Sequence, residues 1–321
     1  MAKLTLLDLA KRSGSDGIQG VVESMTQMNG LLTMIPMRQT TQAMFKYKQR
    51  MSLPSLDFRM LNAGVTPEKS VIRDVIVECK DILGVSEVDK KLAERHPQGV
   101  NAFRAMEDAG FVAAGSNKFN SKLYYGNSAT TAAEIDGIGT ILGTLGGTCI
   151  SATGNTASVQ TSMYFWSFSD ATGANGRLPG VEVPYFGELP MVSDMGLQMV
   201  YETGSSTKKY PAYTSIFEFS PAFAVYDVRS VGRLCNIQAA ALAAPPTVAL
   251  INQVITAMAP YQVDLITCNK ATYNSIQTLK GTTFTNSEPY ASSDIFKRAK
   301  YFDNIPIIID ENITSTEAVV S

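Results

Sequence analysis

Two alternating segments joined by a long connection constrain this chain more than any other feature. Residues 45–51 alternate in the manner of a β-strand. One face carries Phe45, Tyr47 and Met51, and the other carries Lys46, Lys48 and Arg50. Residues 70–80 are rich in β-branched side chains and place Asp74 and Glu78 on one face. We therefore predict an antiparallel pair with acids opposite the basic stripe, in a register that the alternation does not fix.

The connection at residues 52–67 contains Pro54, Gly64 and Pro67 and far exceeds the roughly two to five residues of an ordinary hairpin loop. Strands of about ten residues would carry its tip roughly 30 Å from the base. A two-stranded ribbon alone is marginally stable in water, so it needs another surface on which to lie. The sequence thus predicts an arm that projects from its own body.

Composition excludes several classes of protein. The 321 residues are 45% hydrophobic, enough for a large core, whereas a net charge of −2 argues against a dense basic surface for reading nucleic acid. Apolar runs are only a few residues long, so we expect no membrane span. Asp8 comes too early for a signal peptide.

The residues that usually carry chemistry are sparse. Cys79, Cys149, Cys235 and Cys268 form no CxxC pair, and we predict small buried hydrophobes in a reducing cytoplasm. His96 is the single histidine and precedes Pro97, which favours a helix-junction role over proton transfer. Residues 136–143 fit GxGxxxG, but no clear strand precedes them and no ribose-binding acid follows. We expect no catalytic, cofactor or metal site.

Several helices follow from apolar spacing. Residues 4–12 and 16–28 are predicted as short helices, the second with an apolar stripe of Ile18, Val21, Val22, Met25 and Met28. A longer helix begins near Pro97 and carries Val100, Phe103, Met106 and Val112 inward. Gly110 and Gly115 each cost about 1 kcal/mol relative to alanine, so a kink or break is expected near Gly115.

The second half of the chain reads as alternating strands and helices. Residues 162–169 form an aromatic strand, better suited to core packing than to base stacking, and residues 170–190 read as a surface excursion. A hairpin is expected from 197–202 and 213–220, followed by a strand at 225–237. There Asp227, Arg229 and Arg233 share one face, either as a solvated surface or as an inter-subunit ion-pair site. The chain is completed by a helix that starts at 245–247 and ends at Pro260, a strand at 263–268, a helix at 270–279, a polar loop at 281–293 and a strand at 301–313.

Three blocks resemble one family. They are residues 53–94, with Leu53-Pro54-Ser55-Leu56-Asp57-Phe58-Arg59 and Glu87-Val88-Asp89-Lys90-Lys91-Leu92, the D-x-R-x-V-x-R-x-x-N-I run within 225–237, and Ile305-Pro306 within 301–313. Together they resemble the major capsid proteins of tailed double-stranded DNA bacteriophages. The resemblance implies an α+β, HK-ninety-seven-like fold. Its parts would be an N-terminal arm at 1–33, an extended loop at 34–80, a peripheral domain with a long spine helix at 81–135 and 300–321, and a mainly axial domain at 136–299 that also holds some peripheral strands.

The resemblance also implies a function. The chain would assemble with itself through hexamers and pentamers into an icosahedral head that encloses the phage genome. The extended loop would contact neighbours through Lys46, Lys48, Arg50, Leu53, Phe58 and Arg59. Residues 16–28 would then contact neighbouring subunits rather than pack on their own domain, and both interpretations stay open.

The expected partners follow from the same resemblance. They are a separate scaffolding protein, a portal and packaged double-stranded DNA held without sequence specificity, with assembly in the bacterial host cytoplasm and residence in the virion capsid. Some relatives join a loop lysine to a neighbour's asparagine, and Lys46 and Lys48 lie in that region. The alternatives are an encapsulin-type compartment shell and a virion adhesin or tail protein.

Overall fold

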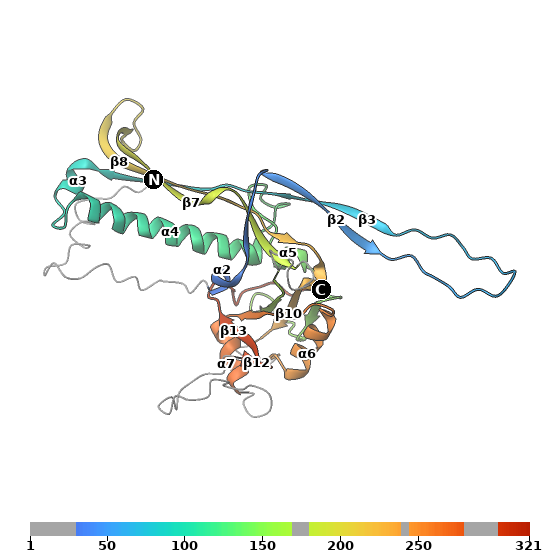
Figure 1. Ribbon diagram of the computed structural model, residues 1–321. Coiled ribbons are helices and arrows are strands. Elements are labelled where there is room, and N and C mark those ends of the chain that lie inside the picture. The colour runs from blue at the N-terminus through green and yellow to red at the C-terminus, as the bar shows by residue number, and fades with distance from the viewer. Residues whose placement is uncertain (1–29, 169–179, 239–243, 279–300) are drawn as a thin grey trace.

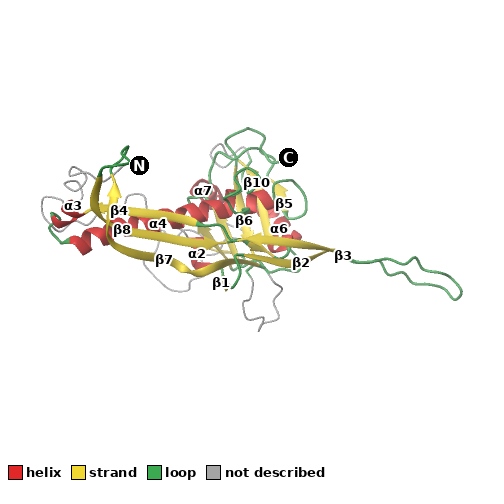
Figure 2. Ribbon diagram, turned by 90° about the horizontal axis from the view of Figure 1, so that it is seen from above, coloured by secondary structure: helices red, strands yellow, loops and turns green. Residues whose placement is uncertain are grey.

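The structure is a computed structural model that describes residues 30–168, 180–238, 244–278 and 301–321. The predicted helices at 4–12 and 16–28 and the polar loop at 281–293 lie outside these residues. An elongated sheet with a long helix along it, a compact sheet at one end of that helix, and a projecting two-stranded arm make up the fold (Figures 1 and 2).

The elongated sheet has the strand order β1-β7-β8-β4, with the short β9 also paired to β7. Its strands are β1 (Met37–Thr40), β4 (Ile82–Asp89), β7 (Val181–Tyr201), β8 (Lys209–Pro221) and β9 (Ala224–Val225). The predicted hairpin is confirmed, since Tyr201 pairs with Lys209 across the β7–β8 turn. The predicted surface excursion is wrong from residue 181 onward, because β7 begins there and absorbs its irregular residues at a register shift between Phe186 and Met191.

The long helix α4 (Val100–Tyr125) runs along the elongated sheet (Figure 1). It begins three residues after Pro97, and the buried His96 ring stacks on Phe103 at 5.1 Å between centroids. The predicted break near Gly115 does not occur, because aromatic contacts hold the helix on the sheet: Phe111 stacks on Phe217, with centroids 5.2 Å apart. Two short helices flank this region: α2 (Gly30–Met34) and α3 (Lys90–Glu94), the latter capped by Asp89.

The compact sheet has the strand order β12-β13-β11-β6-β10-β5. Its strands are β5 (Cys149–Ser151), β6 (Thr161–Trp166), β10 (Val231–Ile237), β11 (Leu265–Cys268), β12 (Tyr301–Phe302) and β13 (Ile305–Ile309). The predicted strand at 301–313 is therefore two short strands that end at Ile309. Helices α5 (Ile138–Ile141), α6 (Val248–Ala257) and α7 (Lys270–Thr278) belong to the same half of the molecule.

Strand β6 forms the centre of the core and confirms the aromatic-strand prediction. Tyr164 and Trp166 join the cluster that contains Leu123 and Tyr124 of α4. Met163 and Phe165 point into the other cluster, with residues of α6 and α7. Because neighbouring side chains on a strand point to opposite faces, one buried strand connects both halves of the core. Within the described ranges, no helix combines the length and apolar composition needed to cross a membrane.

The predicted continuous strand at 225–237 is wrong. Val228–Ser230 forms a 3-10 turn, η1, and β10 starts at Val231. The Asp227 carboxylate accepts a hydrogen bond from the backbone N–H of Arg229 at 2.9 Å, a local bond that competes with strand pairing. Asp227, Arg229 and Arg233 therefore do not share a face: Asp227 and Arg229 form a local ion pair at 2.8 Å, while Arg233 is buried.

Candidate assembly interface

The arm consists of β2 (Met44–Ser52), β3 (Val71–Glu78) and the connection between them. The arm extends away from both sheets, in the direction opposite to the end of α4 that lies next to α3 (Figure 1). The two strands are antiparallel, with Lys48 opposite Asp74 and Phe45 opposite Val77. The projecting arm predicted from the alternation is thus present.

Charge pairing along the arm follows the prediction in part. Lys46 Nζ lies 2.7 Å from Asp74 Oδ2, and the hydrogen bond from Lys46 lowers the pKa of Asp74. Glu78 instead lies opposite Met44 and pairs with Lys80 at 2.5 Å. The Lys46–Asp74 pair joins the two strands but is exposed, so it adds little to stability, while Glu78 and Lys80 pair locally, two residues apart.

The connection at the tip exposes a set of large apolar side chains. Their exposed fractions are 73% for Leu53, 91% for Leu56, 109% for Phe58, 84% for Met60 and 93% for Leu61. Lys46, Lys48 and Arg59 are exposed as well, and Arg50 lies in β2 with its backbone opposite Ile72. Contiguous exposed apolar groups of this kind mark interaction surfaces in soluble proteins. The apolar tip side chains, Lys48 and Arg59 are therefore accessible to another molecule, whereas Lys46 is paired with Asp74.

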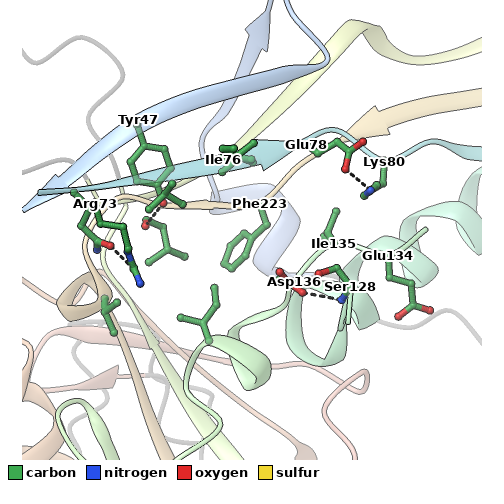
Figure 3. A pocket seen from close by; sticks show the side chains of 16 residues that line it. Tyr47, Arg73, Ile76, Glu78, Lys80, Ser128, Glu134, Ile135, Asp136 and Phe223 are labelled. Carbon is green, nitrogen blue, oxygen red and sulfur yellow. Dashed lines mark hydrogen bonds and ion pairs between the residues drawn. The ribbon is translucent and has the colours of Figure 1, made fainter. Parts of the chain in front are cut away.

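The root of the arm is fixed to the body by Tyr47 (Figure 3) and by Gln49. Tyr47 Oη donates to the carbonyl oxygen of Val225 at 2.7 Å, and Gln49 Nε2 donates to that of Tyr226 at 3.3 Å. The rings of Tyr47 and Tyr226 meet edge to face with centroids 4.9 Å apart. Burial raises the pKa of Tyr47, so it remains a neutral donor.

A second layer of polar contacts lies beneath this root. Glu182 of β7 is buried and accepts from Arg38 Nη2 of β1 at 2.7 Å. Tyr226 Oη donates to the same carboxylate oxygen. Burial and the Glu182 carboxylate together raise the pKa of Tyr226. The arm is therefore connected through Tyr226 to two strands of the elongated sheet, which fixes the direction in which it projects.

A recess of about 290 Å³ opens between the arm root and the start of the compact half (Figure 3). Its lining mixes Arg73, Glu78 and Lys80 with Asp136 and Phe223. Asp136 already accepts the backbone N–H of Ser128 at 2.7 Å. The described part of the chain holds no group of three His, Cys, Asp or Glu side chains placed to bind a metal.

The glycine motif at 136–143 has a structural role. A Cβ on Gly137 would lie 2.6 Å from the carbonyl oxygen of Lys122, and one on Gly139 would lie 2.7 Å from that of Tyr124. These glycines let α5 pack directly against the last turn of α4. The motif therefore forms a contact between two helices instead of a phosphate-binding loop.

Arg233 occupies a buried network that the sequence analysis missed. Its Nη2 donates to Glu317 Oε2 at 2.9 Å, and its Nε donates to Ser162 Oγ at 3.1 Å. Burial works against the charge, but Tyr164 and Glu317 outweigh it and raise the pKa of Arg233. Three residues further on, the Asn236 side chain donates to Val320 O at 2.9 Å and accepts from Val320 N at 2.8 Å. The R-x-x-N part of the motif therefore holds the C-terminal segment.

The sequence profile of the major capsid protein GP7 family matches residues 13–321. A chain of bacteriophage Epsilon15 superimposes with a TM-score of 0.75 at 21% identity, covering 100% of this chain and 98% of that one. The bacteriophage JBD30 capsid gives 0.53 at 12% identity, covering 97% and 99%. No curated protein sequence matches.

The match to a capsid-protein family over most of the chain defines the class, a viral shell-forming subunit. The chain belongs to the major capsid protein GP7 family, and it is a structural protein of a phage capsid. The resemblance to tailed-phage major capsid proteins is confirmed. The encapsulin of Synechococcus elongatus PCC 7942 superimposes with a TM-score of only 0.46, at 12% identity and covering 73% and 96% of the two chains, too low to weigh in the assignment.

Proposed function

We propose that this capsid protein assembles through hexamers and pentamers into an icosahedral head around the phage genome, and that the arm clasps an adjacent copy. The exposed apolar tip carries the proposal, because Leu56 and Phe58 are almost fully exposed in the part of the chain that the structure describes. Interfaces of obligate assemblies bury thousands of Å² and have apolar centres. The arm supplies such a centre at a distance from its own body.

The domain division follows the same reasoning. Residues 1–33 form the N-terminal arm and 34–80 the extended loop, while 81–135 form the peripheral domain together with β7 and β8, because β8 pairs with β4. The remainder of 136–299 forms the axial domain. The sequence analysis placed residues 301–309 in the peripheral domain; we propose instead that they lie with the axial domain, and the pairing of β13 with β11 supports this. Residues 310–321 return to the end of α4, where Asp310 accepts from Asn120 Nδ2 at 2.7 Å.

Further partners are proposed on the family assignment alone. They are a separate scaffolding protein, a portal, and packaged double-stranded DNA contacted without sequence specificity. Assembly would take place in the bacterial host cytoplasm.

The Asp227–Arg229 pair is exposed enough to contact a neighbour, whereas Arg233 is buried and paired with Glu317 of the same chain.

The test removes residues 51–67 and joins the shortened strands by a two-residue turn. We expect a folded subunit with unchanged circular dichroism and no closed particles by electron microscopy. A milder variant, Leu56→Asp with Phe58→Asp, should also fold but form no closed particles. The control is Lys208→Asp at the β7–β8 turn, since Lys208 is also exposed. Normal yields of closed shells from the deletion would contradict the proposal.

A further inference from the structure

An apolar groove of about 490 Å³ lies between α4 and the elongated sheet. Its walls include Phe111 and Phe119 of α4, Phe217 of β8, Val192 of β7, and Leu32 and Met37 near α2. Val112, also in its wall, is 47% exposed. Apolar side chains lining a groove of this size are unfavourable in water unless another element covers them.

Gly115 gives a second indication that something covers this groove. It lines the groove in the middle of a 26-residue helix, and a Cβ built on it meets nothing within 4 Å. A glycine inside an exposed helix costs about 1 kcal/mol relative to alanine. Aromatic packing keeps the helix on the sheet, but within the described residues nothing lies close to Gly115 itself to offset this local cost. A helix packed closely across Gly115 would compensate it, because small residues let two backbones approach.

The chain itself supplies a segment of matching character at the groove's edge. Residue 29 leads directly into α2, whose Leu32 forms part of the wall. The preceding residues 16–28 carry the apolar stripe of Ile18, Val21, Val22, Met25 and Met28 at helical spacing. A helix from residue 18 to 28 is about 15 Å long, against about 12 Å for the α4 wall from Phe111 to Phe119.

We infer that residues 16–28 form a helix that packs into this groove of the same chain, with its apolar stripe across Gly115. The other occupant with exposed apolar side chains is the arm tip of a second copy. Residues 53–60 of the tip are not helical in the structure, and within the described residues no contact places the tip beside the groove. The inference concerns the subunit by itself and does not depend on the proposed head assembly.

The first experiment compares aspartate substitutions at two valines in the unassembled subunit. Val112 and Val71 are 47% and 48% exposed among the described residues, and only Val112 lines the groove. Val112→Asp should lower the Tm by several degrees, and Val71→Asp should leave it nearly unchanged. Equal, small effects of both substitutions would overturn the inference.

Two glycines of α4 provide a test with opposite expected signs. Neither Gly110 nor Gly115 has an atom within 4 Å of a built Cβ, but only Gly115 lines the groove. Gly110→Ala should raise the Tm through helix propensity, whereas Gly115→Ala should lower it because the added methyl separates the two helices. A rise for both would mean that the face of α4 at Gly115 is open.

Cross-linking identifies the occupant. In a Cys79→Ser background, Val22→Cys and Val112→Cys are combined and treated with a short bis-maleimide at low protein concentration. The inference predicts a link within one chain, seen as a joined peptide pair in the monomer band by mass spectrometry. A dimer band from the Val22→Cys, Val112→Cys variant, or no link at all, would overturn the inference. So would a cross-linked dimer of a variant that combines Phe58→Cys with Val112→Cys.

Discussion

Arg233 of β10 donates from Nη2 to Glu317 Oε2 at 2.9 Å, and both side chains are about 95% buried, with 6% and 5% of their surface exposed. The same carboxylate accepts from Tyr125 Oη at the end of α4 at 2.6 Å. One glutamate near the C-terminus thus joins the compact sheet to the long helix. The second arginine of the D-x-R-x-V-x-R-x-x-N-I run thus has a physical role, since Arg233 positions the C-terminal segment that carries Glu317.

Removing one member of this pair is expected to be costly. Glu317→Gln keeps the volume but leaves the Arg233 guanidinium buried without a counter-charge, a change that typically costs about 3–5 kcal/mol. The free energy of unfolding of the subunit in urea measures the loss. Arg229→Gln is the control, because Arg229 is 56% exposed and pairs locally, so about 0–1 kcal/mol is expected. Similar losses for both variants would contradict the assigned role.

Local patterns predicted the arm and failed for Arg233, for different reasons. The alternation at 45–51 is read within one strand, and the half-buried Tyr47 beside the exposed Lys46 and Lys48 bears it out. Glu317, by contrast, is 84 residues from Arg233, and no local spacing records such a pairing. The prediction that Arg233 shares a strand face with Asp227 also failed because the Asp227 side chain accepts the backbone N–H of Arg229, which favours a turn before β10 begins.

The elongated sheet shows the same division between local and tertiary information. Gly187 and Pro190 indicated a loop, yet both lie within β7. Gly187 has φ +80° in the stretch where the strand shifts register, a conformation that glycine adopts without strain. Pairing to β8 on both sides of the irregularity outweighs the local preference. The helix through Gly115 was misjudged for the same reason, because packing on the sheet outweighs propensity.

Gly139→Ala should destabilise the subunit by about 1–3 kcal/mol through overpacking. Its φ is negative, so the effect is steric: the new methyl would lie 2.7 Å from the Tyr124 carbonyl oxygen and would push α5 off α4. A lower Tm in thermal unfolding measures this. Gly64→Ala at the arm tip is the control, since nothing lies within 4 Å there. An unchanged Tm for Gly139→Ala would mean that α5 does not pack against the end of α4.

Tyr47→Phe should loosen the arm without unfolding the body. The substitution removes the 2.7 Å hydrogen bond to the Val225 carbonyl but keeps the ring against Tyr226. About 1 kcal/mol is expected for a lost hydrogen bond of this kind. Hydrogen exchange should therefore accelerate several-fold in residues 44–52 and 71–78, while β6 and β10 keep their protection. Uniform acceleration in both regions would show that Tyr47 supports the whole fold rather than the arm root.

Cys268 should resist alkylation in the folded subunit. Burial raises the pKa of its thiol from 9.0 to about 12, so at about pH 8 its reactive thiolate is far scarcer than that of an ordinary cysteine. Half-buried Cys79 should react first, and Cys268 only on unfolding. Since the folded pKa exceeds the unfolded one, the neutral thiol's contribution to stability is complete below pH 9 and declines as pH rises toward 12. Cys268→Ala should accordingly lose less Tm across that range than the unmodified chain. Peptide mass spectrometry measures the alkylation of each cysteine over time. Equal rates for Cys79 and Cys268 in the native subunit would contradict the burial of Cys268.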